Sequence, residues 1–353
     1  MTSSANVSVI VVNYKTPHYA IECIRSLVQE RVAIPGLEVV LIDNASGDGS
    51  PDIMAISLAD LVEDGFVKLM PLGLNGGFGW ANNQALLTLM ARANPPEFVM
   101  LLNPDCTIEP HAVSILRDEL LAYESCVVAG SQLLNPDGSC AGSAFRFPTV
   151  GRELIRGSGI ALLGRLLRIA PTLITSDEPC EADWVTGASC LLRTSALFDH
   201  GLFDDGFFLY FEEVELMFRL RASGRTVRHV PDSRVHHVGG ASTGLGEGKS
   251  LSRQTYPLYW FQSRRRFFTR AYGPIRAWLA GIAWITGSAV RRVLAAIEPA
   301  RADPSALGNL RHMLAHGLRA SSGDRSNFIA RAGDLPGKPP RWTAITDDKT
   351  YAA

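Results

Sequence analysis

The sequence has 353 residues, which is long for one compact domain and short for three, so we expect one large domain or two fused ones. A hydrophobic fraction of 46% beside 20% charged residues excludes a chain that is disordered throughout. Lys and Arg number 34 against 35 Asp and Glu, so a formal net charge of −1 provides no basic field to attract nucleic acid. The 6 cysteines form no C-x-x-C pair, which argues against a zinc module or a disulfide scaffold and favours reduced thiols.

The first 134 residues alternate between short β-branched runs and longer amphipathic stretches. Near-continuous apolar runs such as SVIVV and FVMLL are typical of a parallel sheet covered on both faces, which predicts a doubly wound α/β fold. We predict strands at Val7–Tyr14, Leu37–Asn44, Phe66–Leu72, Phe98–Asp105 and Cys126–Leu134, and helices near Pro17–Glu30, Pro51–Val62, Trp80–Arg92 and Pro110–Tyr123.

The second half is less regular. Residues 151–175 mix basic and apolar side chains, which favours a mobile or membrane-facing loop, and the later part of 207–223 is predicted to be helical. The glycine-rich stretch 236–250 is predicted to be a loop. Past Ala300 the chain is rich in Arg, Pro, Gly and Ser, so we expect poor order in the last 30 or so residues.

One uncharged segment of 14 residues, Ala277–Val290, lies between Arg276 and Arg291. Crossing a bilayer takes about 20 apolar residues, so this segment is too short to do so unaided. Two interpretations remain open. The segment lies in a membrane interface, with Trp278 and Trp284 at the headgroups, or it is a helix packed on the core.

Polar residues gather where two predicted strands end. The second strand continues into the run that starts Asp43-Asn44, and the fourth ends in Asn103-Pro104-Asp105. Each acid alone fits a turn or a helix cap. Together, at the carboxyl ends of strands in one sheet, they predict a ligand crevice.

Asn75-Gly76-Gly77-Phe78-Gly79 follows the third strand and opens a helix, so backbone N–H groups there can approach a phosphate or a sugar. It is not a dinucleotide fingerprint, which follows the first strand. The run 244–250 ends in Gly-Lys-Ser like a phosphate-binding loop. However, Thr243 stands where that motif needs its first glycine, so we reject an ATPase.

The densest polar cluster is FDDGFFLYFEEVE at 203–215. Its glutamates can complement the dipole of a helix that starts there, but nearby aromatic rings can also raise a carboxyl pKa to suit a general base. Glu212 and Glu215 are three apart and share a helix face, which leaves Glu213 pointing elsewhere. Further on, His236-His237 is either a metal or diphosphate contact or a surface pair.

Taken in order, these segments resemble the family 2 inverting glycosyltransferases, in particular the bacterial rhamnosyltransferase-like branch, over about Val7 to Gly273. The matching runs are VSVIVVNYK, IDNASGDGS, NGGFGWANN, LLNPD, DWVTGASCLLR, FDDGFFLYFEEVELMFRL, HHVGGAS and YWFQSRRRFFTRAYG. The resemblance implies a glycosyltransferase A-type fold, in which a Rossmann-like, mostly parallel sheet is fused to an acceptor-binding half with C-terminal helices. We therefore expect a nucleotide-sugar-binding half at 1–134, an acceptor-binding and catalytic half at 135–250, an aromatic and basic helical segment at 251–300, and a partly disordered extension at 301–353.

The resemblance also assigns site residues. Asp105 matches the metal-holding acid of a D-x-D motif, which here reads Asn103-Pro104-Asp105 and so lacks one acid. Asp105 and His237 would hold Mg²⁺ or Mn²⁺, with His236 as the less favoured histidine. Glu213 and Glu212 would be the catalytic residues. The base matches Glu213, because the family usually has Glu-Asp where this chain has Glu212-Glu213. The longer side chain moves the carboxylate by about one bond length, and a misplacement of about 1 Å can cost ~100-fold in rate. The donor-side residues are Asn13, Asp43, Asn75, Gly77, Phe78, Asn103, Trp184 and Gly187.

The resemblance implies transfer of L-rhamnose or a similar deoxyhexose, with inversion, from a dTDP-sugar to a lipid-linked or surface-glycan acceptor of the cell envelope. The alternatives are a UDP-hexose or UDP-N-acetylhexosamine transferase of the same fold, and a non-catalytic nucleotide-sugar-binding protein, which the Glu-for-Asp change motivates. We expect a cytoplasmic protein, peripheral at the inner face of the cell membrane through Arg264–Arg266, Trp278 and Trp284, with no nucleic-acid partner.

Overall fold

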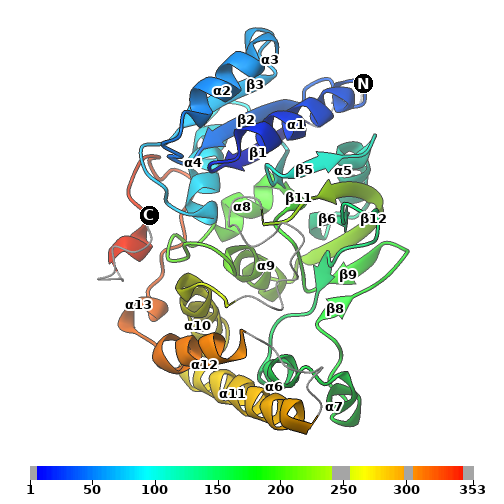
Figure 1. Cartoon of the computed structure of the whole chain (residues 1–353). Helices are drawn as coiled ribbons and strands as arrows, with labels where there is room; N and C mark the ends of the chain where they lie inside the picture. The colour runs from blue at the N-terminus through cyan, green and yellow to red at the C-terminus, as the bar shows by residue number, and fades with distance from the viewer. Residues whose placement is uncertain (1–5, 241–254, 298–304, 345–353) are drawn as a thin grey trace.

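The computed structural model describes residues 6–240, 255–297 and 305–344 of the chain. One side of its central sheet consists of parallel strands in the order β3–β2–β1–β4 (Figure 1). Apart from the edge strand β3, these strands are almost entirely buried, as their unbroken apolar sequences require. They are β1 (Val7–Asn13), β2 (Glu38–Asp43), β3 (Val67–Pro71) and β4 (Phe98–Leu102).

The helices of this half connect the strands and cover the sheet, so the predicted elements of the first 134 residues are confirmed. They are α1 (Pro17–Leu27), α2 (Ser50–Ser57), α3 (Ala59–Glu63), α4 (Phe78–Met90) and α5 (Ala112–Ala122). The strand predicted at Phe98–Asp105 ends earlier, at Leu102. The chain turns after β4, where the Cys106 N–H donates to the Asn103 carbonyl (3.2 Å), and β5 (Cys106–Ile108) follows.

The other side of the sheet mixes strand directions. Strand β11 (Ser189–Arg193) lies antiparallel between β4 and β6 (Cys126–Leu134), and β12 (Thr226–His237) runs parallel to β6. Strand β12 also pairs antiparallel with β5 and with β9 (Cys180–Ala182). The loop predicted from residue 236 is thus wrong for the two histidines, which end β12, while residues 241–250 lie outside the described residues.

Smaller elements complete the part of the chain that follows β6. A second sheet has the order β10–β7–β8, with β7 (Ala144–Phe145), β8 (Leu173–Ile174) and β10 (Trp184–Val185). Helix α8 (Thr194–His200) follows β11, and α9 (Glu212–Ala222) confirms the helix predicted in the later part of 207–223.

The loop predicted at 151–175 is instead largely helical, in α6 (Val150–Ser158) and α7 (Ala161–Leu166). Helix α6 packs closely on α11 (Pro274–Ile297) because glycines meet at the crossing. A Cβ atom at Gly157 would lie 2.3 Å from the Trp284 carbonyl oxygen, and one at Gly287 would lie 2.3 Å from that of Leu154. Around this pair lie α10 (Leu258–Tyr272), α12 (Ala306–His312) and the turn η4 (Met313–Gly317) (Figure 1).

The uncharged segment 277–290 belongs to α11, which by length and composition alone is the one helix of the described chain able to span a bilayer. Its two tryptophans differ, since Trp278 is 48% exposed and Trp284 is buried against the helices around it. The expected membrane contacts of Trp284, Arg264 and Arg266 are therefore wrong. Both arginines are buried in ion pairs, with Glu153 and Asp204 respectively.

The described C-terminal residues have specific partners, in contrast to the expected poor order. A capping box between Ser321 and Asp324 caps the N-terminus of helix α13 (Ser322–Arg325). The short 3-10 helix η5 (Arg341–Ala344) carries the buried Trp342. Hydrogen bonds connect this segment to residues 202–205 and to Gly76, as described below.

The buried pair between α10 and α6 gives a stability prediction. Arg264 Nε donates to Glu153 Oε2 (2.7 Å), and neither side chain reaches solvent. Arg264→Met should lower the free energy of unfolding by about 3–5 kcal/mol, because it removes the nearest cation of the buried Glu153 carboxylate and leaves Arg156 at 3.9 Å. Denaturant unfolding measures this.

The double variant Arg264→Met/Glu153→Met should recover most of that loss, because no uncompensated charge remains. Arg25→Met, at the exposed pair with Asp60, is the surface control and should leave stability nearly unchanged. A single variant as stable as the wild type would contradict this role of the pair.

Candidate active site

The first part of the site lies where β1 and β2 end side by side, with Asn13 in register with Asp43. Asn13 Nδ2 donates to Asp43 Oδ1 (2.8 Å), and the Ser46 N–H and hydroxyl donate to its two oxygens at 3.0 and 2.6 Å. Asn13 also accepts hydrogen bonds from Thr16, so its amide orientation is determined. These contacts hold the Asp43 carboxylate at the sheet edge where the sequence predicts a ligand crevice.

The second part is the donor loop, residues 75–78, which joins β3 to α4. Asn75 Oδ1 accepts from Asn44 Nδ2 (2.8 Å) and from the Gly77 N–H (3.1 Å), which connects the loop to the end of β2. On its other side the Phe78 N–H donates to the Phe208 carbonyl (3.1 Å). Gly77 has φ +87°, and a Cβ there would lie 1.9 Å from that carbonyl oxygen, so only glycine fits.

The third part brings Asp105 and His237 together from distant sequence positions. Strand β5 pairs with the end of β12, with His237 opposite Cys106, and this places His237 Nε2 3.3 Å from Asp105 Oδ1. The Gly239 N–H donates to Asp105 Oδ2 (3.1 Å). The predicted partnership of Asp105 and His237 is thus geometrically possible, whereas His236 lies against Glu109, with Nε2 3.2 Å from its Oε1.

These residues fit a divalent cation. His237 Nε2 is buried and has no hydrogen-bond partner among the described residues, although it lies beside the carboxylate. Cys106 completes a group of potential ligand atoms within 4.8 Å of one another, but its Sγ contacts the Ala188 carbonyl (3.6 Å). Hard cations such as Mg²⁺ prefer oxygen ligands, so the Asp105 carboxylate suits one, and the His237 imidazole beside it can add a nitrogen ligand.

The fourth part is the start of α9. Tyr210 and Phe211 both have φ 68°, a left-handed conformation that costs about 1–3 kcal/mol for each such residue. Packing compensates for this, because the Phe211 ring contacts those of Trp260 and Phe267 from α10. The strained turn starts the helix abruptly, which determines where the glutamates that follow it point.

The three glutamates of this turn have separate surroundings. Glu215 pairs with Arg219 (3.0 Å), which makes it structural, and Glu212 packs toward Gly79 of α4. Glu213 instead lies against Gly187, where a Cβ would be 3.5 Å from both the Glu213 Cβ and the Phe78 ring. Glu213 is therefore the glutamate beside the predicted donor-side residues.

Burial raises the pKa values of the two neighbouring glutamates, Glu212 and Glu213, to different extents. Desolvation raises the pKa of Glu213 to about 7, although hydrogen bonds from backbone N–H groups at the helix start lower it in part. Desolvation, together with the neighbouring Glu213 carboxylate, raises the pKa of Glu212 well above its ordinary range. Burial and the adjacent charge thus favour the protonated form of Glu212, while a pKa of about 7 suits Glu213 for acid–base work.

Residues 187–188 connect these parts. Gly187 lies beside Glu213 and Phe78, and the Ala188 carbonyl accepts from the Asn103 N–H (2.8 Å) next to Asp105. Trp184, on the same segment, stacks on Phe145 (4.3 Å between ring centroids) and donates to the Arg146 carbonyl (3.3 Å). The predicted site residues therefore form one connected region, which includes Trp184 from the predicted donor-side set.

Sequence reasoning missed the supporting residues of this region. Asn44 and Ser46 lie in the quoted run after β2, but only the fold shows that they hold Asn75 and Asp43. No sequence signal placed Trp342 at the donor loop, where its indole N–H donates to the Gly76 carbonyl (2.8 Å).

Comparison with known proteins identifies the family of this chain. The model of glycosyl transferase family 2 matches residues 8–139. The N-acetylglucosaminyl-diphospho-decaprenol L-rhamnosyltransferase of Mycobacterium tuberculosis is 31% identical over 241 residues, 65% of this chain and 75% of that protein. The chain belongs to glycosyl transferase family 2. This family 2 glycosyltransferase is also 28% identical over 172 residues to the rhamnosyltransferase WbbL of Escherichia coli K12, 46% of this chain and 60% of WbbL.

Solved structures support the expected A-type fold of this family 2 glycosyltransferase. The mannosyltransferase PcManGT from Pyrobaculum calidifontis, in complex with GDP-Man and Mn²⁺, superimposes with a TM-score of 0.55 at 17% identity, covering 90% of this chain and 88% of that one. GalNAc-T7 with UDP, GalNAc and Mn²⁺ gives a TM-score of 0.55 at 16% identity, covering 91% of this chain and 56% of that one.

The surroundings of Glu213 predict a pH dependence. Only the ionised carboxylate accepts a proton, so kcat should fall about tenfold per pH unit below a pKa of about 7 and level off above it. Glu213→Gln should lower turnover by about 100-fold or more and remove this acidic limb, because the amide accepts no proton. Steady-state rates between pH 5.5 and 9 measure both.

Glu212→Gln and Glu215→Gln are the matched controls, and both should keep the acidic limb of the profile. Glu213→Asp restores the residue usual in the family and should retain more activity than Glu213→Gln. Normal turnover in Glu213→Gln together with an inactive Glu212→Gln would move the base to Glu212.

Proposed function

We propose that this glycosyltransferase transfers L-rhamnose or a similar deoxyhexose from a dTDP-sugar to a lipid-linked or surface-glycan acceptor, with inversion at the anomeric carbon. The observation that carries the reaction type is the single titratable carboxylate, Glu213, beside Gly187 and the donor loop. The choice of sugar and acceptor rests on the relatives, whose names describe rhamnosyl transfer and, in the mycobacterial protein, a diphospho-decaprenol acceptor.

In the proposed reaction Glu213 accepts the proton of the acceptor hydroxyl as its oxygen attacks the anomeric carbon. The new carbon–oxygen bond forms while the bond to the nucleoside diphosphate breaks, so the diphosphate leaves with the bonding electrons. Glu212 packs toward Gly79 and Glu215 is paired with Arg219, so we assign neither of them to a covalent intermediate. A single displacement inverts the configuration.

The rest of the site binds and orients the donor. Asp43, oriented by Asn13, faces the nucleoside, and the donor loop approaches the sugar or diphosphate with Trp184 and Gly187 across from it. Asn103 connects the metal side to residue 188. A divalent cation, Mg²⁺ or Mn²⁺, held by Asp105 and His237 would neutralise the charge that develops on the departing diphosphate.

A donor screen tests this function. The protein is incubated with dTDP-rhamnose, UDP-hexoses, UDP-N-acetylhexosamines and GDP-mannose, with a polyprenyl-diphosphate-linked acceptor and Mn²⁺, and thermal shifts and transfer are measured. We expect transfer from dTDP-rhamnose. Transfer from a UDP-sugar alone would overturn the choice of donor, and binding without transfer or hydrolysis of any donor would overturn the enzymatic role.

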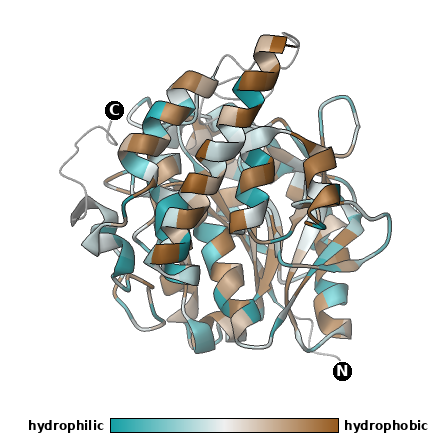
Figure 2. Cartoon of the chain, turned by 90° about the horizontal axis from the view of Figure 1, so that it is seen from below, coloured by the Kyte–Doolittle hydropathy of each residue, from teal (hydrophilic) through white to brown (hydrophobic). Residues whose placement is uncertain are grey.

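We also propose that the protein works in the cytoplasm at the inner face of the membrane, through the surface formed by α7 and α11. Both helices carry exposed apolar and exposed basic side chains, and Figure 2 shows hydrophobic and hydrophilic positions mixed along the helices on this side. Such a face suits an anionic lipid surface. The apolar residues are Leu162, Leu166, Ile275, Trp278 and Leu279, and the basic ones are Arg165, Arg168, Arg276 and Arg292.

This proposal keeps the division into a donor half at 1–134, a catalytic half at 135–250, a membrane-facing helical segment at 251–300 and an extension at 301–353. The segment at 251–300 would bring a lipid-linked acceptor to Glu213, because α10 packs on the start of α9.

The metal proposal predicts the effect of removing a charge at position 105. Asp105→Asn keeps the size of the side chain but should nearly abolish transfer and weaken metal-dependent donor binding, because the amide binds a hard cation poorly. Calorimetry of dTDP binding with and without Mn²⁺ measures this. Asp137→Asn, on an exposed turn, is the control. Normal activity of Asp105→Asn at limiting Mn²⁺ would remove Asp105 from this role.

The membrane proposal predicts salt-sensitive binding. The wild type should float with vesicles containing anionic phosphatidylglycerol and detach at high salt, since exposed charges are screened. Trp278→Glu should reduce flotation several-fold without lowering Tm, because this side chain is largely exposed. Phe198→Glu, exposed on α8, is the control. Equal flotation of Trp278→Glu and wild type would contradict this surface.

A further inference from the structure

The C-terminal strap, which we define as residues 322–344, connects the C-terminal helices to the donor loop. It starts at α13 beside α10 and ends beside α4 (Figure 1). Neither the family model, which matches residues 8–139, nor the motifs of the sequence include it. Its contacts fall into three groups along its length.

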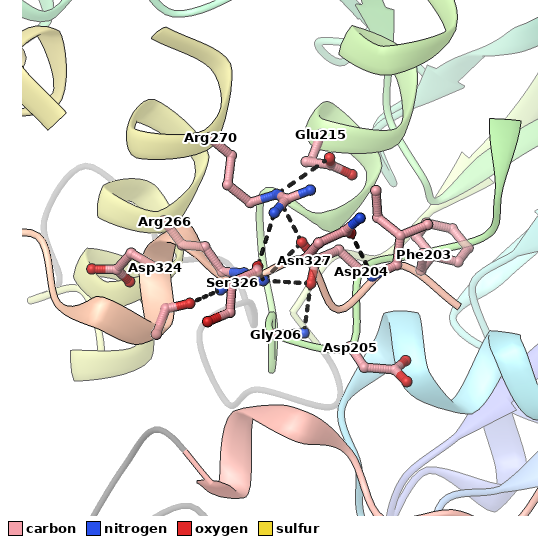
Figure 3. Close-up of polar contacts among 12 residues, drawn as sticks. Phe203, Asp204, Asp205, Gly206, Glu215, Arg266, Arg270, Asp324, Ser326 and Asn327 are labelled. Atoms are coloured by element: carbon pink, nitrogen blue, oxygen red, sulfur yellow. Dashed lines mark hydrogen bonds and ion pairs between the residues drawn. The ribbon is translucent and has the colours of Figure 1, made fainter. Parts of the chain in front are cut away.

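The beginning of the strap is held by buried arginines of α10 (Figure 3). Arg266 donates to the carbonyls of Gly323 (2.6 Å) and Ser326 (2.9 Å), and at the same time to Asp204 Oδ1 (2.7 Å). Arg270 donates to the same Ser326 carbonyl (2.9 Å). Asp204 belongs to residues 201–211, the loop that leads to Glu212, which we call the catalytic loop. Arg266 and Arg270 therefore bind both this loop and the strap.

The middle of the strap pairs with the catalytic loop as a short antiparallel strand would. The Leu202 N–H donates to the Ala330 carbonyl (2.9 Å), and the Ala330 N–H donates to the Phe203 carbonyl (3.2 Å). The Asp205 N–H donates to the Phe328 carbonyl (3.0 Å). Ala330 is buried in the core beneath the sheet, so this part of the strap has a defined position.

The end of the strap contacts the donor loop through Trp342. Its backbone N–H donates to the Asp205 carbonyl (3.1 Å), and its indole Nε1–H donates to the Gly76 carbonyl (2.8 Å). Its ring lies edge-on to that of Phe208 (5.0 Å between centroids), whose carbonyl accepts from the loop. Trp342 is 9% exposed, so the indole is held between the loop and the segment that precedes α9.

The peptide unit between Gly76 and Gly77 is therefore held at both ends. Its carbonyl accepts from Trp342, and its N–H donates to Asn75 Oδ1, which also accepts from Asn44 next to Asp43. Glycines have no Cβ to restrict their backbone, so the orientation of this peptide depends on its hydrogen-bond partners. A loop that approaches a sugar diphosphate with its backbone needs that orientation before the donor arrives.

We propose that Trp342 is a positioning residue of the donor site, which orients the Gly76–Gly77 peptide for binding of the nucleotide-sugar. The proposal rests on the proposed function, since it assumes that the donor loop contacts a nucleotide-sugar. Trp342 acts through Gly76 and does not itself touch the reacting atoms.

The test is Trp342→Phe, which keeps an aromatic ring against Phe208 but removes the indole N–H. We expect KM for the sugar nucleotide and Kd for dTDP to rise about 3- to 10-fold, as for the loss of one hydrogen bond, with kcat changed less. Steady-state kinetics of the full chain and calorimetry with dTDP measure these values, and a thermal scan reports on the fold.

Gln84→Met is the matched control. It removes another bond to the strap, from the Gly337 N–H to Gln84 Oε1 (2.6 Å), but does not touch the donor loop. We expect Tm to fall slightly while KM and Kd stay at wild-type values.

Two results would overturn the role of Trp342 while the proposed function stands. In one, the wild type transfers sugar and Trp342→Phe has wild-type KM and Kd. In the other, Trp342→Phe and Gln84→Met raise KM equally and in proportion to their loss of Tm, which is a structural effect alone. A wild type that binds dTDP but transfers no sugar would overturn the proposed function, while a rise in Kd confined to Trp342→Phe would still support the positioning role.

Discussion

The buried contact between Arg266 and Asp204 is the interaction on which the rest of the catalytic half depends. Arg266 is 2% exposed and donates to both Asp204 oxygens, at 2.7 and 2.9 Å, while it also holds the C-terminal strap (Figure 3). Such a pair is costly to desolvate and costlier to break, because either partner alone would be a buried charge. The loop that leads to the glutamates of α9 is thereby tied to a helix more than 50 residues further along the chain.

This constraint also bears on the proposed base, Glu213, which stands where the resemblance implies an aspartate. The loop enters α9 through two left-handed aromatic residues, and Gly187 faces Glu213 with no side chain of its own. The space beside Gly187 accommodates the extra methylene of Glu213. The neighbouring Glu212 is more deeply buried, so its protonated form is favoured, while Glu213 has a pKa of about 7. Adjacent and chemically identical side chains thus take different roles because their environments differ.

The elements and site residues of the first half could be predicted from the sequence because they depend on local signals. Strand β6 has the predicted bounds Cys126–Leu134, and the carboxyl ends of β1 and β2 do bring Asn13 and Asp43 together, as parallel pairing requires. The resemblance supplied the partnership of Asp105 with His237, whose contact arises from the pairing of β5 with β12. What failed depends on remote partners. Arg264 looks like a membrane-facing cation until Glu153, 111 residues away, is found beside it, and the strap has no motif because backbone groups hold much of it.

The central claim is that one carboxylate promotes a single displacement on a donor held at this sheet edge. The anomeric configuration of the product tests it most directly, because it depends on the number of displacements and not on rate or affinity. The glycoside formed by the wild type from its preferred sugar nucleotide would be purified, and its one-bond carbon–hydrogen coupling at the anomeric centre measured by NMR. The account predicts the configuration opposite to that of the donor. Retention of the donor's configuration would contradict it, since a second displacement or a front-face path would then be required.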